Sequence, residues 1–275
     1  MATAIQPHFK DVTYGEDSDR NVLDVYLSTT TIELQPLIVL VHGGGFKAGD
    51  KARPRFLEDF LEAGFAVAAI NYRLSDEATW PAQLTDVTRA VRFLHDKAAD
   101  FGIDPERIAI FGQSAGGHLT ATSTLSLAAN DANIVRAAVV WFGPVDFSMM
   151  DADMAESGQG TSDTNGPSSP ESQLIGAPVG EHPALARAAS PLHFIAALPD
   201  EALLPPVLIM HGARDPLIAA RQSQRLHDAI AASPASSEVE LQILPEGTHG
   251  GGAFREPAAI GAVIEFVSDN LALSR

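Results

Sequence analysis

The sequence contains no cysteine. This absence excludes a disulfide framework, a thiolate zinc site, an iron–sulfur cluster and a cysteine nucleophile. It leaves the redox compartment open, because a protein without thiols tolerates either an oxidising or a reducing one. With 275 residues, the chain can bury a sizeable hydrophobic core without cross-links.

Basic residues are scarce: 18 Lys and Arg stand against 35 Asp and Glu, which gives a net charge of −17. A surface of this sign repels phosphate polyanions, so nucleic acid is not expected as a partner. Solubility is the simplest role for the acidity.

Long hydrophobic runs are also missing. A membrane span needs about 18 consecutive apolar residues, and the longest aliphatic runs here are Leu37–Val41 and Ala66–Ile70. The segment from Met1 to Asp11 has neither a basic n-region nor an apolar h-region, so no secretory signal is expected. We therefore expect no membrane partner and a cytoplasmic location, with secretion of a trimmed precursor as the alternative.

Short apolar runs alternate with longer helical patterns. Helices are predicted at Pro81–Ala99, Ala115–Ala129, Gln222–Ala232 and Pro257–Leu271. Strands are predicted at Val22–Leu27, Leu37–Val41, Phe65–Asn71, Arg107–Phe111, Ala137–Phe142, Pro206–Met210 and Val239–Leu244. This alternation predicts an α/β fold with a mostly parallel sheet flanked by helices. The first two strands, which precede any helix, are the candidates for an antiparallel edge.

Residues 146–198 interrupt the alternation with weak periodicity. Within them, Asp151–Gln173 is rich in glycine, proline and serine and has no Lys or Arg. Long irregular insertions are usually functional loops or disordered segments. We predict a single domain over residues 1–275 that contains an irregular, mobile insertion, acting as a lid over one end of the sheet or remaining disordered without a role.

A serine nucleophile is predicted where the strand Arg107–Phe111 ends. The residues that follow, Gly112-Gln113-Ser114-Ala115-Gly116, have the G-x-S-x-G pattern of a nucleophile elbow between a strand and a helix. Glycines are needed because side chains two positions from the serine would collide with neighbouring backbone. The helix that begins after Ser114 points its N–H groups towards a developing oxyanion.

A glycine-rich loop, His42-Gly43-Gly44-Gly45-Phe46, directly follows another predicted strand. The pattern is typical of an oxyanion loop, so we expect the N–H groups of Gly44 and Gly45 to act together with that of Ala115. A phosphate-binding loop is disfavoured, because no Lys-Ser/Thr pair follows. His42 is expected to anchor the loop.

The base and the acid should follow the serine in the order acid, then histidine. Asp215 comes shortly after the strand Pro206–Met210, and His249 lies in a glycine-rich loop after Val239–Leu244. We predict a triad of Ser114, His249 and Asp215, with Asp146 as the alternative acid. Structural roles are expected for His118 and His211.

Five side chains are candidates for the substrate pocket. Phe46 and Gln113 adjoin the oxyanion loop and the nucleophile, and Trp80, Phe142 and Ile218 are candidate wall residues. Trp141 and Met149 are further candidates. For each aromatic residue, core packing is the competing role.

The chain resembles an α/β hydrolase of the hormone-sensitive-lipase-like esterases. Most closely it is similar to the bacterial feruloyl and acetyl esterases, a carbohydrate esterase group. The resemblance extends from about Val22 to Leu271 and is carried by His42–Phe46, Asn71-Tyr72-Arg73-Leu74, Trp80-Pro81-Ala82, Asp104–Gly117 and the loops of Asp215 and His249.

Three departures favour the small bacterial esterases over lipase-like enzymes. Ser75-Asp76-Glu77 replaces the usual Ala-Pro-Glu, Gln113 replaces the usual Asp, and only 41 residues precede the oxyanion loop. The resemblance implies hydrolysis of short-chain (acetyl-type) or feruloyl esters through an acyl-enzyme, with no cofactor and no metal. The alternatives are an arylformamidase or amidase on the same scaffold, or a catalytically silent ligand-binding protein. Either a monomer or a homodimer is compatible with the sequence.

Overall fold

The computed structural model describes residues 5–30, 34–130, 134–199, 201–235 and 238–272. The segment from Met1 to Asp11, in which no secretory signal is expected, lies partly outside these residues. Among the described residues, no helix has the length and hydropathy needed to span a bilayer.

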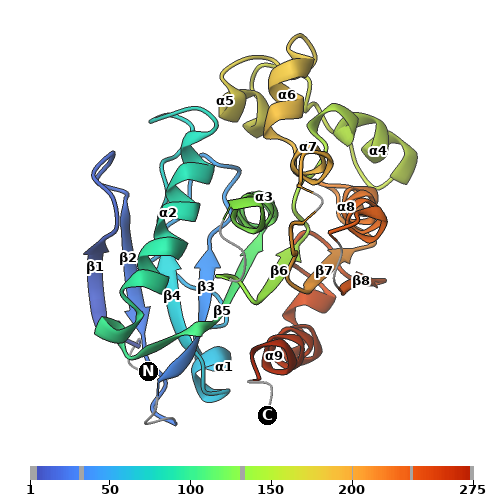
Figure 1. The fold of residues 1–275 in the computed structure, drawn as a ribbon. Helices are drawn as coiled ribbons and strands as arrows, with labels where there is room; N and C mark the ends of the chain where they lie inside the picture. The colour runs from blue at the N-terminus through green and yellow to red at the C-terminus, as the bar shows by residue number, and fades with distance from the viewer. Residues whose placement is uncertain (1–4, 31–33, 131–133, 200, 236–237, 273–275) are drawn as a thin grey trace.

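Eight strands of the described chain form one twisted sheet in the order β1-β2-β4-β3-β5-β6-β7-β8 (Figure 1). β3 to β8 run parallel, and β1 and β2 form an antiparallel edge. The strands are β1 Phe9–Thr13, β2 Val22–Tyr26, β3 Gln35–Val41, β4 Ala66–Ile70, β5 Ile103–Gln113, β6 Ala137–Trp141, β7 Val207–Gly212 and β8 Val239–Leu244.

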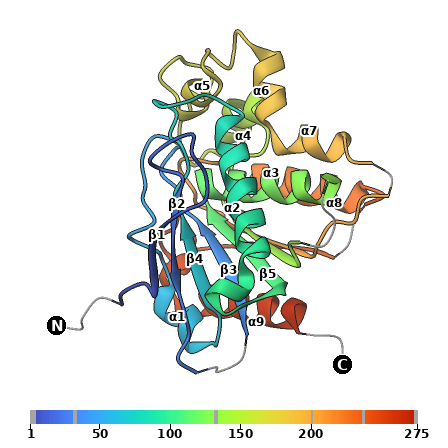
Figure 2. The same cartoon turned by 60° about the vertical axis from the view of Figure 1, so that its left-hand side comes forward.

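Helices cover both faces of the sheet (Figures 1 and 2). One face carries α2 Ala82–Asp96, α3 Ala115–Asn130 and α8 Ala220–Ala232; the other carries α1 Leu57–Glu62 and α9 Pro257–Leu271. Between β6 and β7 lie α4 Met150–Ser157, α5 Pro170–Ile175, α6 Pro183–Ala189 and α7 Pro191–Ala196. Short 3₁₀ turns are η1 Ala98–Phe101, η2 Phe147–Met149 and η3 Ala253–Arg255.

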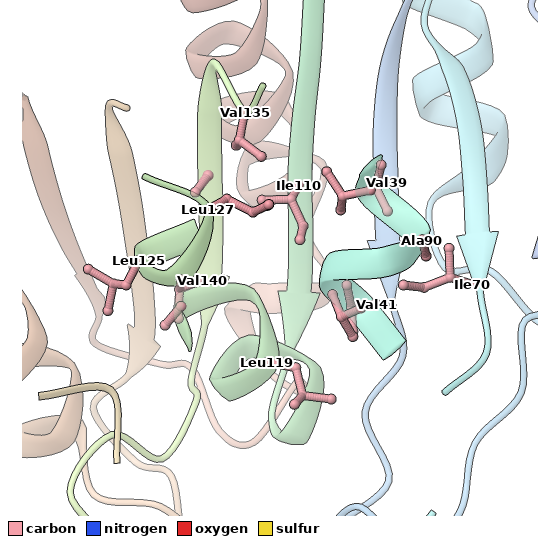
Figure 3. Packing of buried hydrophobic residues seen from close by; sticks show 14 of the residues in the cluster. Val39, Val41, Ile70, Ala90, Ile110, Leu119, Leu125, Leu127, Val135 and Val140 are labelled. Atoms are coloured by element: carbon pink, nitrogen blue, oxygen red, sulfur yellow. The ribbon is translucent and has the colours of Figure 1, made fainter. Parts of the chain in front are cut away.

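The strand pleat divides the core into two clusters. Leu37, Val39 and Val41 of β3 pack with α2 and α3, whereas Ile38 and Leu40 pack with α1 and α9. Figure 3 shows part of the first cluster, in which strand and helix side chains meet. Because the central strands are covered on both faces, they are continuous apolar runs in the sequence.

The prediction that the first two predicted strands form an antiparallel edge is wrong. β2 pairs with β4, and β3 lies inside the sheet between β4 and β5. The edge is completed by β1, whose sequence FKDVT is half polar and lacks an apolar run, so its pattern did not predict a strand. Helix α1 was also not predicted, because its six residues are too short for a clear period.

The segment 146–198, predicted as an irregular insertion, contains four short helices joined by irregular loops. It contains α4 to α7, which gather at the top of Figure 1 away from α9. Pro170, Pro183 and Pro191 stand at the first helical position of α5, α6 and α7, where a proline is favourable rather than disruptive. The four helices have six to eight residues each, too few to show periodicity in the sequence.

Candidate active site

Ser114 occupies the sharp turn between β5 and α3. Its backbone has φ 56°, a left-handed conformation that is uncommon for a residue with a Cβ. The turn is held on both sides: the N–H of Ser114 donates to Trp141 O at 2.9 Å, and the N–H of His118 donates to Ser114 O at 3.0 Å. The serine is thereby raised above the carboxyl end of the central strand.

The two glycines of the elbow pattern are required by close backbone approach. A Cβ on Gly112 would lie 2.2 Å from the carbonyl oxygen of Gly116, and a Cβ on Gly116 would lie 2.1 Å from that of Val41. Real Cβ atoms do not approach backbone this closely, so both positions exclude any side chain. This is the collision that the sequence pattern predicts.

Three side chains from three strand ends form a continuous hydrogen-bonded row. His249 Nδ1 lies 2.7 Å from Asp215 Oδ2, and His249 Nε2 lies 3.0 Å from Ser114 Oγ. The ionised carboxylate can only accept, so Nδ1 carries the proton and Nε2 is left to accept from the serine hydroxyl. The arrangement can therefore remove a proton from Ser114.

Asp215 is buried and well supplied with donors. Its Oδ1 accepts from the N–H groups of Leu217 at 2.8 Å and Ile218 at 3.0 Å. Burial by itself would raise the pKa of Asp215, but hydrogen bonds from His211 and His249 outweigh it and hold the pKa below its usual range. The carboxylate is charged at neutral pH and can orient an imidazole.

Asp146, the alternative acid, faces a different neighbourhood. The main-chain N–H of Asp146 donates to Gln222 Oε1 at 2.8 Å, and its carboxyl accepts from the backbone of Ser148 and Met149. Burial raises the pKa of Asp146. The structure brings Asp215, not Asp146, to His249.

The loop after β3 is held by a hydrogen bond from its own histidine. His42 Nδ1 donates to Gly43 O at 2.8 Å, and since the C=O and N–H of a trans peptide point in opposite directions, the N–H of Gly44 points away from His42. Burial lowers the pKa of His42 to about 4, so the ring is neutral and serves as an anchor. Within the described chain, the N–H groups of Gly44, Gly45 and Ala115 donate to no protein acceptor.

A pocket of about 740 Å³ opens at the serine. Four of the five predicted pocket residues line it: Phe46, Gln113, Phe142 and Ile218. Trp80 does not, so that prediction is wrong. Its indole N–H donates to Ala188 O at 3.1 Å, and its ring packs edge-on against His118 and Phe194, which makes it part of the core beneath α7.

The two further wall candidates are also misplaced. Trp141 is completely buried in the cluster under α9, and Met149 is absent from the lining, which takes the neighbouring Met150 instead. Neighbouring residues differ in this way because side-chain direction alternates along a strand and turns by about 100° per residue along a helix.

Sequence reasoning missed two sets of lining residues. Arg53 and Arg55 come from the loop before α1, and Thr161–Thr164 and Glu171 come from the inserted segment. Glu171 is 7% exposed, and burial raises its pKa to about 7. None of these residues belongs to a spacing pattern, so only the path of the loops could have revealed them. The part of the chain described here contains no group of three His, Asp or Glu residues arranged to hold a metal ion.

The chain is similar to a known protein family and to curated esterases. Residues 23–230 match the BD-FAE family. The chain is 30% identical over 288 residues to Esterase LipQ of Mycobacterium tuberculosis, which covers 95% of this chain and 61% of LipQ. It is 28% identical over 260 residues to the isoprenylcysteine alpha-carbonyl methylesterase ICME of Arabidopsis thaliana, covering 84% of this chain and 54% of ICME. The chain thus spans little more than half the length of these curated relatives.

Solved structures agree with this similarity. A truncated carbohydrate esterase from gut microbiota superposes with a TM-score of 0.81 at 29% identity, covering 96% of this chain and 95% of that one. A bifunctional GH43-CE protein of Bacteroides eggerthii also gives a TM-score of 0.81, at 26% identity, and this chain matches 35% of its length.

Proposed function

The chain belongs to the BD-FAE family of α/β-hydrolase esterases, and from this premise we propose that it hydrolyses carboxylic esters with Ser114, His249 and Asp215 as the catalytic triad. One observation supports the proposal above the others: Ser114 Oγ, His249 and Asp215 are joined by hydrogen bonds of 3.0 and 2.7 Å. This is the nucleophile–base–orienter geometry that acyl transfer requires.

Acylation begins when Ser114 Oγ attacks the ester carbonyl carbon while His249 Nε2 takes the hydroxyl proton. The buried Asp215 carboxylate stabilises the imidazolium that forms. The N–H groups of Gly44, Gly45 and Ala115 donate to the oxyanion of the tetrahedral intermediate. Their lack of a protein acceptor within the described chain fits this role.

Collapse of the intermediate breaks the bond between the carbonyl carbon and the alcohol oxygen. His249 gives its proton to the leaving alcohol, and the acyl group stays on Ser114. A water molecule then attacks the acyl-enzyme while His249 accepts its proton. The second intermediate collapses with cleavage of its bond to Ser114 Oγ, which takes the proton from His249 as the acid is released. No cofactor enters either half-reaction.

The proposed substrates are short-chain, acetyl-type esters or feruloyl esters. A pocket of about 740 Å³ is large enough for either acyl group. The similarity to a protein described as a carbohydrate esterase supports this class. The segment 146–198 supplies part of the pocket wall and is proposed as a lid over it. Cytoplasmic location and a monomeric or homodimeric state stay predictions from the sequence.

The test measures initial rates on p-nitrophenyl acetate, a longer acyl ester, methyl ferulate and an acetylated xylo-oligosaccharide. Ser114→Ala should lower kcat by about 10⁴-fold or more. The matched control is Ser126→Ala, on the same helix but outside the pocket lining, which should keep wild-type rates.

Two outcomes would overturn the proposal. Faster cleavage of formanilides than of all esters would favour the arylformamidase alternative. A folded wild type that turns over none of these substrates would favour the silent ligand-binding alternative.

A further inference from the structure

Half of the fourteen arginines of this acidic protein have an acidic partner. Seven of them lie within 4.0 Å of a carboxylate oxygen: Arg20, Arg73, Arg89, Arg107, Arg136, Arg214 and Arg225. With 35 acidic residues against 18 basic ones, such partners are abundant. A group of neighbouring arginines that lacks such partners therefore calls for a reason.

Two such arginines line the pocket, and a third interacts electrostatically with one of them. Arg53 and Arg55 line the pocket, and Arg255 ends η3, six residues after His249. Within the described residues, no ion pair joins any of the three to a carboxylate. Burial, followed by the positive charge of Arg255, lowers the pKa of Arg55, so the two cations are close enough to repel each other.

Arg55 is held in a defined position beside the triad. Its Nη1 donates to Gln113 Oε1 at 2.6 Å, and its guanidinium lies 5.0 Å from the ring centroid of Phe56. A Cβ placed on Gly250 would be 3.2 Å from the same Nη1. The guanidinium therefore sits between the residue before Ser114 and the residue after His249. Of its five N–H donors, one is used by Gln113.

The pocket that Arg55 lines also has an apolar part. Leu40, Ala69 and Phe111 line it, although they belong to the core cluster on the α1 and α9 face of the sheet. Phe56, the ring beneath Arg55, stacks on Phe111 at 6.5 Å between centroids. A cation in a pocket that is partly apolar fits a ligand that has an apolar body and an anionic end.

The acidic residues that line the same pocket do not neutralise this region. Asp50 pairs with Arg20 and accepts from Asn71 Nδ2 at 3.0 Å. Glu171 has a pKa raised to about 7 by burial, so a large fraction of it is neutral near that pH. Asp163 belongs to the inserted segment, and no ion pair joins it to Arg55 in the described chain.

We propose that Arg55 binds a carboxylate carried by the ester substrate, with Arg53 and Arg255 strengthening the positive potential around it. A planar guanidinium pairs with a carboxylate through two parallel hydrogen bonds. The inference rests on the proposed esterase function for the identity of its ligand. The carboxylate is on the acyl part or on the alcohol part of the ester, and the experiment separates the two.

The test uses two pairs of substrates, and the two members of each pair differ by one negative charge. For the alcohol part, 4-acetoxybenzoate is compared with its methyl ester. For the acyl part, the p-nitrophenyl monoester of glutaric acid is compared with p-nitrophenyl pentanoate. Only one pair places the carboxylate on the part of the ester that Arg55 binds. In that pair, Arg55→Gln should lower kcat/KM for the negatively charged substrate by about 10- to 100-fold. The neutral substrate should change by less than about threefold.

The matched control is Arg187→Gln, which removes the same charge from exposed α6 away from the pocket lining. It should leave the anion-to-neutral ratio unchanged. Arg55→Lys should keep only part of the wild-type anion-to-neutral ratio of kcat/KM, because an ammonium does not form two parallel hydrogen bonds with a carboxylate. Raising the salt concentration should reduce the ratio in wild type and have little effect in Arg55→Gln.

Failure of this inference can be told apart from failure of the esterase proposal. If wild type hydrolyses neutral esters and Arg55→Gln leaves both anion-to-neutral ratios unchanged, the carboxylate site is wrong and the esterase function stands. Calorimetry of intact 4-acetoxybenzoate with Ser114→Ala needs no turnover. Binding that is at least about tenfold weaker in Ser114→Ala/Arg55→Gln supports the site even if no ester is hydrolysed.

Discussion

Ser114 is strained by its left-handed backbone, and its neighbours make that strain tolerable. A non-glycine residue in this region costs of the order of 1–3 kcal/mol. The hydrogen bonds to Trp141 O and from the His118 N–H hold the turn, and the bare glycines at 112 and 116 let β3, β5 and α3 meet closely. The strain aims Oγ at His249 instead of into the helix.

Glu171 offers a prediction that depends on pH. Because burial raises its pKa from 4.5 to about 7, the folded protein keeps a proton that the unfolded chain has already lost. The free energy of unfolding should therefore fall as pH rises from about 4.5 to about 7. The Glu171→Gln variant has no group that ionises at this position, so it does not undergo this fall. Its free energy of unfolding, relative to that of wild type, should increase by on the order of 2–3 kcal/mol between pH 4.5 and 8.

Urea denaturation of both proteins at pH 4.5 and pH 8 measures that difference. Glu156→Gln, which removes an exposed carboxyl of α4, is the control and should show no pH-dependent gain. An equal stability difference at both pH values would mean that folding does not change the pKa of Glu171.

At the scale of elements, the loop between β3 and α1 is tied to the antiparallel edge of the sheet. Lys51 Nζ lies 2.6 Å from both Asp24 Oδ1 and Asp11 Oδ1. The main-chain N–H of Lys51 donates to Asn71 Oδ1 at 2.7 Å. Lys51 and Asp24 are both nearly inaccessible to solvent. This loop carries Gly44 and Gly45, the proposed oxyanion donors, at one end and Arg55 at the other, so the buried pair positions both.

Replacing Lys51 with Met should be strongly destabilising, because it leaves the Asp24 carboxylate buried without a counter-charge. The expected cost is about 3–5 kcal/mol. Adding Asp24→Asn should recover part of it, since the amide oxygen of the substituted side chain can still accept from the Asp11 N–H. Chemical denaturation of wild type, single and double variants measures the coupling. A double variant less stable than Lys51→Met would refute this account of the pair.

One residue of α4 connects the inserted segment to α8. The carboxylate of Asp153 accepts from Arg225 through two nitrogens and from Gln222 Nε2 at 2.7 Å, and it is 1% exposed. Gln222 Oε1 in turn accepts from the N–H groups of Val145 and Asp146. The entry to the segment and its first helix thus depend on α8.

Asp153→Ala should loosen the inserted segment while the sheet stays folded, because it leaves Arg225 without its partner. Hydrogen exchange should become faster by about tenfold or more for amides between residues 150 and 175. Amides of β3 to β7 should keep their protection. Glu156→Ala, an exposed acid on the same helix, is the control. Uniform acceleration across the sheet would show that Asp153 supports the whole fold and not this segment.

For the whole molecule, the excess of acidic residues predicts a dependence of stability on salt. At a net charge of −17, long-range repulsion opposes the compact state, and counter-ions screen it. Raising NaCl from about 20 to about 300 mM should increase Tm by about 2–4 °C. Calorimetry at neutral pH tests this, and an unchanged or lower Tm would mean that local ion pairs dominate over net repulsion.

Agreement between sequence and structure is best where a pattern is long or a motif is stereochemically constrained. The predicted bounds of β8 and α9 coincide with those observed. The elbow lies where G-x-S-x-G predicts it, because Gly112 and Gly116 have no room for a Cβ. The sequence pattern does not predict the short elements, because β1 is half polar and each of α4 to α7 spans too few residues for periodicity to appear.

The sequence by itself determined the fold class, the elbow and the order of Ser114, Asp215 and His249 after β5, β7 and β8. These follow from local rules of backbone sterics and hydrophobic period. Only the tertiary structure decided that Asp215 and not Asp146 meets His249, that Trp80 packs in the core, and that Arg55 stands beside the nucleophile. Those facts depend on how loops far apart in the chain converge, and no spacing within one segment encodes that path.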